Sequence, residues 1–132
     1  METVKIRCKD IMVGDYIANR NGSPMQIVAV DEDNAYACAG NEERPWIFGD
    51  NEGYEPQPII LTPEILEKNG WESDGIFMER RVDENTFFVW ANGYNVVLYQ
   101  NGNYMCDCKY VHTLQHALRL MGLNELADNF KI

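Results

Sequence analysis

Residues 86–110 read TFFVWANGYNVVLYQNGNYMCDCKY, and this stretch decides the fold expected for the chain. It contains three runs rich in β-branched and aromatic residues: 86–91, 94–100 and 104–110. Two Asn-Gly pairs, at 92–93 and 101–102, separate the runs, and Asn-Gly supplies the positive φ angles of a tight hairpin turn. With a further β run at 76–81, the stretch predicts a four-stranded antiparallel meander. Its large aromatic residues are expected in the core with Trp71: Phe87, Phe88 and Trp90.

Helix signals lie on both sides of the meander. Before it, Thr62 can cap a helix, Pro63 suits the first helical position, and the Asn-Gly pair at 69–70 can end the helix in a left-handed turn. After it, apolar residues recur at helical spacing: Val111, Leu114, Leu118 and Met121. Residues 58–132 are therefore expected to form a helix, the meander and a C-terminal helix.

The first forty residues predict short strands instead. An alternating run at 3–8, apolar runs at 25–30 and 35–39, and an Asn-Gly turn at 21–22 suggest a curled sheet. The segments Met-Val-Gly-Asp-Tyr-Ile at 12–17 and Gln-Ile-Val-Ala-Val-Asp at 26–31 resemble the entry strands of SH3-like, KOW-type small barrels.

We therefore expect an α+β fold with two modules. Residues 1–57 would form a small SH3-like β module with an acidic loop. Residues 58–132 would form a helix–β-meander–helix module that shares a core with it.

The composition bounds the function. A net charge of −10, from 21 acidic residues against 11 Lys plus Arg, repels phosphate backbones and anionic lipids, so non-specific nucleic-acid binding is not expected. No stretch approaches the ~20 apolar residues of a membrane helix, and residues 1–9 do not resemble an export signal. We expect a cytoplasmic protein with four reduced cysteines.

Acidic residues concentrate between positions 31 and 55, where the local net charge is −7. Trp46, Phe48 and Tyr54 lie in this region, and aromatic residues ringed by polar ones predict a surface that binds a protein partner. The alternative is that Trp46 folds back over the N-terminal sheet. A second hypothesis is that the acidic segment imitates nucleic-acid phosphates and inhibits a nucleic-acid-binding protein.

A third hypothesis is metal binding through Cys106, Cys108, His112 and His116, because thiolates and imidazoles are zinc ligands. The alternative is two core thiols and two helix histidines, since a Cys-x-Cys pair on a straight strand holds its sulfurs awkwardly for one ion. Cys108 near His112 lacks the orienting third group of a nucleophilic site, and no phosphate-binding glycine loop is present. We therefore expect no catalytic residue, no cofactor and no enzyme activity.

Two segments resemble a family of short uncharacterised proteins from gut Bacteroidetes and their phages. Residues 58–71, PIILTPEILEKNGW, are similar to the family's PIPLT-E-L-K-GF segment, and residues 109–115, KYVHTLQ, with Glu-Leu at 125–126, are similar to its YVHQLQNLYFALTGEEL segment. The resemblance implies that His112, Leu114 and Gln115 belong to the family pattern, and His112 and Gln115 are candidate interaction residues. It also implies an accessory protein of a phage or mobile element rather than a mechanism.

Overall fold

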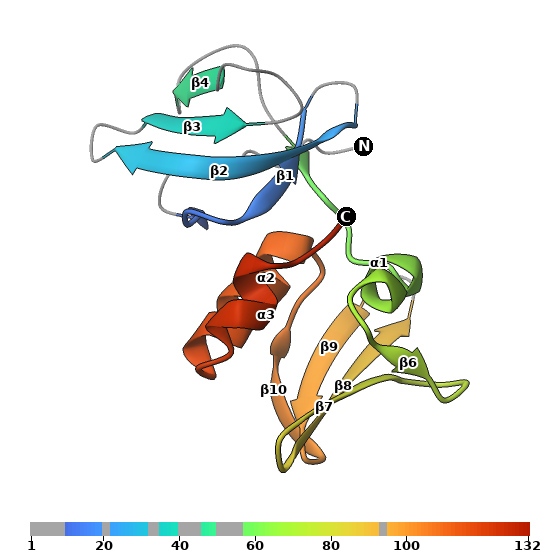
Figure 1. The fold of residues 1–132 in the computed structure, drawn as a ribbon. Coiled ribbons are helices and arrows are strands. Elements are labelled where there is room, and N and C mark those ends of the chain that lie inside the picture. Colours follow the sequence, from blue (N-terminus) through green and yellow to red (C-terminus); the bar gives the residue numbers. More distant parts are fainter. Residues whose placement is uncertain (1–9, 20–21, 32–34, 40–45, 50–56, 93–94) are drawn as a thin grey trace.

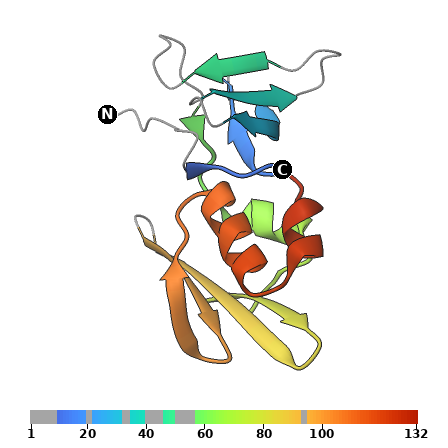
Figure 2. The same ribbon diagram turned by 90° about the vertical axis from the view of Figure 1, so that its left-hand side faces the viewer.

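The computed structural model describes residues 10–19, 22–31, 35–39, 46–49, 57–92 and 95–132 (Figure 1). These residues form two five-stranded antiparallel sheets and three helices, so the fold is mixed α+β as the sequence predicts. The strands of one sheet come before residue 59 and those of the other after residue 71. In Figure 2 the helices lie between the two sheets.

The N-terminal sheet has the strand order β4-β3-β2-β1-β5. Its strands are β1 (Tyr16–Ala18), β2 (Pro24–Asp31), β3 (Ala35–Ala39), β4 (Trp46–Gly49) and β5 (Gln57–Pro58). The apolar runs expected at 25–30 and 35–39 are thus strands, while the run at 3–8 lies outside the described residues. The pairings of the described strands do not close this sheet into a barrel.

The C-terminal sheet contains the predicted meander and has the order β10-β9-β8-β7-β6. Its strands are β6 (Glu72–Ser73), β7 (Met78–Val82), β8 (Asn85–Asn92), β9 (Asn95–Gln100) and β10 (Asn103–Asp107). Asn101 and Gly102 have φ angles of 51° and 87°, so the second Asn-Gly pair makes the turn it predicts. The prediction of four strands missed β6, which is too short and polar to show the alternation of a strand.

The helices are α1 (Pro63–Lys68), α2 (Val111–Leu120) and α3 (Asn124–Asp128). Thr62 caps α1 as predicted, because its hydroxyl oxygen accepts a hydrogen bond from Ile65 N–H at 3.3 Å. All three helices pack on the same face of the C-terminal sheet: Leu66 from α1, Leu114 and Leu118 from α2, and Ala127 from α3 share one core with sheet residues such as Phe87 and Leu98. No helix in the described part of the chain has the length and apolar character needed to cross a membrane.

Among the described residues, the N-terminal half, which contains β1–β5, meets the C-terminal half where β1 and the loop before it contact α2. Tyr16 packs against the C-terminal core, and β1 contacts α2 directly. The division into modules at residues 57 and 58 remains a prediction from the sequence.

Candidate functional site

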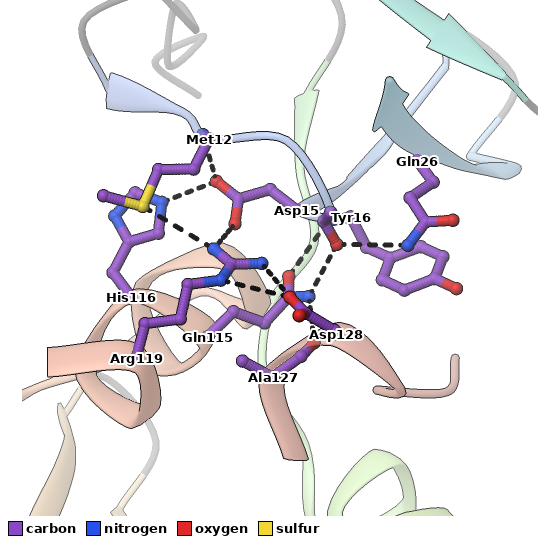
Figure 3. A network of polar contacts seen from close by, with 10 residues as sticks. Met12, Asp15, Tyr16, Gln26, Gln115, His116, Arg119, Ala127 and Asp128 are labelled. Atoms are coloured by element: carbon purple, nitrogen blue, oxygen red, sulfur yellow. Dashed lines mark hydrogen bonds and ion pairs between the residues drawn. The ribbon is translucent and has the colours of Figure 1, made fainter. Parts of the chain in front are cut away.

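A buried carboxylate joins the N-terminal loop to α2. Asp15 has no exposed surface, and its carboxylate accepts a hydrogen bond from Met12 N–H at 2.7 Å. The same carboxylate lies 2.5 Å from His116 Nε2 and forms an ion pair at 2.5 Å with Arg119 Nη1 (Figure 3). A buried charge is tolerated only when it is paired and hydrogen-bonded, so the loop and the helix depend on each other here.

Glycine is needed at position 14 for this contact. Gly14 has a φ angle of 96°, in the left-handed region that glycine favours. A Cβ atom at this position would lie 2.8 Å from Arg119 Nη2. The Gly14-Asp15 turn, which the sequence analysis used only as a strand entry, therefore also positions the buried ion pair.

Gln115 is a second buried residue that links the two halves, through hydrogen bonds of its side chain. Its side-chain oxygen accepts a hydrogen bond from Tyr16 N–H at 2.9 Å, and its Nε2 donates to the carbonyl oxygens of Gly14 at 2.9 Å and Ala127 at 3.0 Å (Figure 3). Gln115 has no exposed surface. Because all of its polar atoms are used internally, we interpret it as a structural residue and not as a contact for a partner.

His112 lies beside this network at the start of α2. Its ring stacks on Tyr110 with centroids 5.8 Å apart and meets His116 edge to face at 5.8 Å. Burial lowers the pKa of His112, outweighing the opposing effect of the Asp15 carboxylate. Its Nδ1 atom is buried and has no hydrogen-bond partner among the described residues. His112 is therefore expected to be neutral at neutral pH.

His112 and His116 line a pocket of about 440 Å³ together with Asp10, Ile11, Met12 and Thr113. The described lining contains no cysteine, so it does not pair a thiol with either imidazole. Thr113 contributes a hydroxyl-bearing side chain to the same lining.

The two cysteines of the predicted metal site belong to the core side of the sheet. Cys108 is completely buried, Cys106 is half-buried, and both are free thiols. Burial raises the pKa of Cys108 to about 12 and also raises the pKa of Cys106, so both are protonated at neutral pH. Across the described ranges, no three His, Cys, Asp or Glu side chains converge on a common point where a metal could bind.

A further feature is the face of the C-terminal sheet that the described helices leave uncovered. Phe77 meets Phe88 and Tyr99 edge to face at 5.9 and 6.2 Å, and Tyr99 meets Tyr104 at 6.4 Å. None of these four residues belongs to the core beneath the helices, and the Tyr104 side chain is 60% exposed. We call this surface the open aromatic face; it consists of Phe77, Phe88, Trp90, Tyr99 and Tyr104.

Phe88 and Trp90 correct an expectation from the sequence, which placed both in the core. Successive strand residues point to opposite faces, so Phe87 and Phe88 cannot both face the helices. Phe87 is 1% exposed in the core, whereas Phe88 pairs with the aromatic rings of the opposite face. Trp90 follows Phe88 by two positions in β8 and is likewise only half-buried.

Carboxylates accompany the aromatic rings on this face. Glu72 and Glu79 are directly opposite each other in the β6–β7 pair, and Glu79 is opposite Phe88 in the β7–β8 pair, so all three share the open face. Asp107 accepts a hydrogen bond from the Tyr104 hydroxyl at 3.2 Å. Arg81 is the basic residue of β7 on this side, and it already pairs with Glu79 at 3.3 Å.

The structure does not test the remaining predicted interaction residues, Trp46, Phe48 and Tyr54. Trp46 and Phe48 belong to β4 of the N-terminal sheet, and their side chains, like the whole of Tyr54, lie outside what the structure describes. Sequence analysis missed the open aromatic face although its signal was present: the alternation in 86–100 puts aromatic residues on both faces of the sheet.

Comparison with known proteins adds no assignment to these features. No protein-family model matches the chain, no curated protein matches it, and no solved structure matches its fold.

Proposed function

We propose that this protein is a non-enzymatic interaction module that binds a basic, partly apolar protein surface through the open aromatic face. The observation that carries the proposal is an aromatic cluster on the side of the sheet that none of the described helices covers, with carboxylates beside it.

Aromatic residues are favourable anchors for a partner. Burial of a large apolar side chain contributes about 1.5–3 kcal/mol, and aromatic residues are enriched among the few residues that dominate binding energy. Tyr99 and Tyr104 combine an apolar ring with a hydroxyl, which suits an interface that is apolar at its centre and polar at its rim. Their edge-to-face contact holds the rings in place before a partner arrives.

The charge of the face selects the partner. Glu72 and Glu79 are opposed across two strands, an arrangement that destabilises a sheet. The β6–β10 segment, residues 72–107, contains six acidic residues and two basic ones, of which Arg81 is paired with Glu79. A partner that carries Lys or Arg around an apolar anchor would relieve this repulsion and would be steered to the face by its field.

The proposal is tested with an array of short peptides that vary in charge and apolar content. We expect peptides that combine Lys or Arg with Leu, Phe or Trp to bind, and acidic or purely polar peptides not to bind. Tyr104→Ala should weaken binding by about tenfold or more, while Glu72→Gln with Glu79→Gln should weaken it and reduce its salt dependence.

Leu120→Ala is the matched control, because Leu120 is an 86% exposed apolar residue of α2, away from the face. Equal loss in Tyr104→Ala and Leu120→Ala, or equal binding of acidic and basic peptides, would refute the proposal.

The Tyr104→Ala variant and the purified protein also distinguish the other functions inferred from the sequence. An acidic inhibitor of a nucleic-acid-binding protein would use the segment 31–55, so its activity would survive Tyr104→Ala. A metal-binding protein would contain stoichiometric zinc after purification without a tag, and the described residues provide no cluster that supports it. The setting in a phage or mobile element and the cytoplasmic location remain predictions.

An SH3-like N-terminal module also remains a proposal. The order β4-β3-β2-β1-β5 supports it, because a three-hairpin meander with its last strand returning to pair with the first is compatible with a small curled sheet. Such a module would offer a second surface for the same partner through Trp46 and Phe48.

A further inference from the structure

A second pocket, unrelated to the open aromatic face, gathers basic residues. It has a volume of about 400 Å³ and lies among the end of α1, β7, α3 and the residues that follow α3. Three basic side chains line it: Lys68, Arg80 and Lys131. Glu125 is the acidic residue in its lining.

In the part of the chain that the structure describes, these three cations have no anionic partner. The described part of the chain contains six Lys and Arg residues, and half of them line this pocket. Of the others, Arg81 and Arg119 form ion pairs with carboxylates, and Lys109 lies 5.7 Å from the centre of the Tyr110 ring. Within the described ranges no carboxylate oxygen lies within 4.0 Å of the charged nitrogens of Lys68, Arg80 or Lys131. In a protein with a net charge of −10, unpaired cations around one hollow form a local positive field.

Arg80 is fixed in position by the backbone of the turn after α1. Its Nη1 donates a hydrogen bond to the Gly70 carbonyl oxygen at 3.1 Å. Gly70 has a φ angle of 84°, which glycine favours, and a Cβ atom there would clash with Arg80 Nη1 as it lies in this structure. Arg80 Nε is buried and has no hydrogen-bond partner among the described residues, so one donor of this guanidinium lacks a described acceptor.

Lys131 is held against α1 in a similar way. Asn69 Nδ2 donates to the Lys131 carbonyl oxygen at 2.8 Å, and Lys131 N–H donates to Asn69 Oδ1 at 2.7 Å. Asn69 Nδ2 also donates to Ile65 O at 2.8 Å, which fixes the amide itself. The backbone positions of Lys68 and Lys131 are therefore set relative to each other before any ligand binds.

We propose that this pocket binds a small organic oxyanion, a carboxylate or a phosphate monoester with an apolar body. The guanidinium of Arg80 and the ammonium groups of Lys68 and Lys131 would hold the anionic group, since arginine donors match the oxygens of both carboxylate and phosphate. The apolar part of the lining consists of Trp71, Leu118, Leu126 and Phe130. The volume is within the range of small-molecule sites.

The test uses three probes that share a phenyl ring: phenyl phosphate, phenylacetate and the neutral phenylacetamide. Binding is followed by shifts of backbone amide and Trp indole NMR signals during titration. We expect saturable shifts at residues 68–71 and 129–131 with an anionic probe at a Kd of about 1 mM or lower, and none with the amide. The probe that binds with the lower Kd shows whether the pocket prefers a phosphate monoester or a carboxylate.

Variants distinguish specific binding in this pocket from a general attraction of anions to basic residues. Arg80→Gln and Lys131→Gln are each expected to weaken binding by about tenfold. Arg81→Gln is the matched control, because it removes the same charge from the neighbouring residue, which is paired with Glu79. If Arg80→Gln fails to fold, Lys68→Gln and Lys131→Gln, both at exposed residues, carry the test. Absence of saturable shifts with both anions, or equal weakening by Arg81→Gln, overturns the proposal.

Discussion

Substitution of Asp15 by Asn tests whether the buried carboxylate holds the two halves together. Asn keeps the size of the side chain but removes the charge that Arg119 and His116 face at 2.5 Å. Asp15 is completely buried and the Arg119 side chain is 14% exposed, so little water can replace the lost partner. Breaking a buried pair costs about 3–5 kcal/mol.

The lower end of that range applies here, because Arg119 keeps a second carboxylate, Asp128, at 3.5 Å. We therefore expect Asp15→Asn to lower the free energy of unfolding by about 3 kcal/mol. The exposed pair of Arg81 and Glu79 provides the comparison: Arg81→Gln should lower it by about 0.5 kcal/mol or less.

Urea unfolding followed by circular dichroism measures both values. A double-mutant cycle with Asp15→Asn and Arg119→Met should give a coupling energy of about 1.5 kcal/mol or more, since the residues are in direct contact. A loss below about 1 kcal/mol for Asp15→Asn, or additive effects in the cycle, would refute the reasoning.

Three other side chains give independent predictions. Gln115→Met should lower the free energy of unfolding by about 2–4 kcal/mol, because it removes three hydrogen bonds to backbone groups; a loss below about 1 kcal/mol in urea unfolding would contradict this. Burial lowers the pKa of His112 below its usual 6.5, so the unfolded chain binds more protons than the folded one as pH falls through 6.5, and stability should decrease there. The pH dependence between about 7.5 and 5.5 should flatten in His112→Gln, and an unchanged slope would show that His112 is not the group responsible. Since burial raises the pKa of Cys108 to about 12, iodoacetamide should leave it unmodified in the native protein and label it in urea, as mapped by peptide mass spectrometry; rapid native labelling would count against its burial.

Local signals in the sequence predicted α1, α2 and the main strands of the meander, but not the short strands β5 and β6. Thr62 and Pro63 begin α1 and Gly70 follows its end, because capping depends on residues within one turn. The β runs and the Asn-Gly pair at 101–102 gave the meander for the same reason. The SH3-like arrangement of the N-terminal strands was not decided by such signals, since turn chemistry specifies hairpins but not how a sheet curls.

The candidate sites depend on contacts between distant residues and could not be read in the same way. Asp15 and Arg119 are 104 positions apart, and nothing in either local sequence indicates that they pair. Gln115 was singled out only by a family resemblance, which could not show that its amide is used internally. The open aromatic face could have been predicted from the sequence, because strand alternation places Phe87 and Phe88 on opposite faces of the sheet.

Chemical-shift mapping of the best-binding basic peptide on the isotopically labelled protein tests the central claim most directly. The account predicts that the largest changes fall on β8, β9 and β10, with side-chain shifts at Phe88, Tyr99 and Tyr104. Changes confined to the helices or to the N-terminal sheet, with the aromatic signals unmoved, would contradict it.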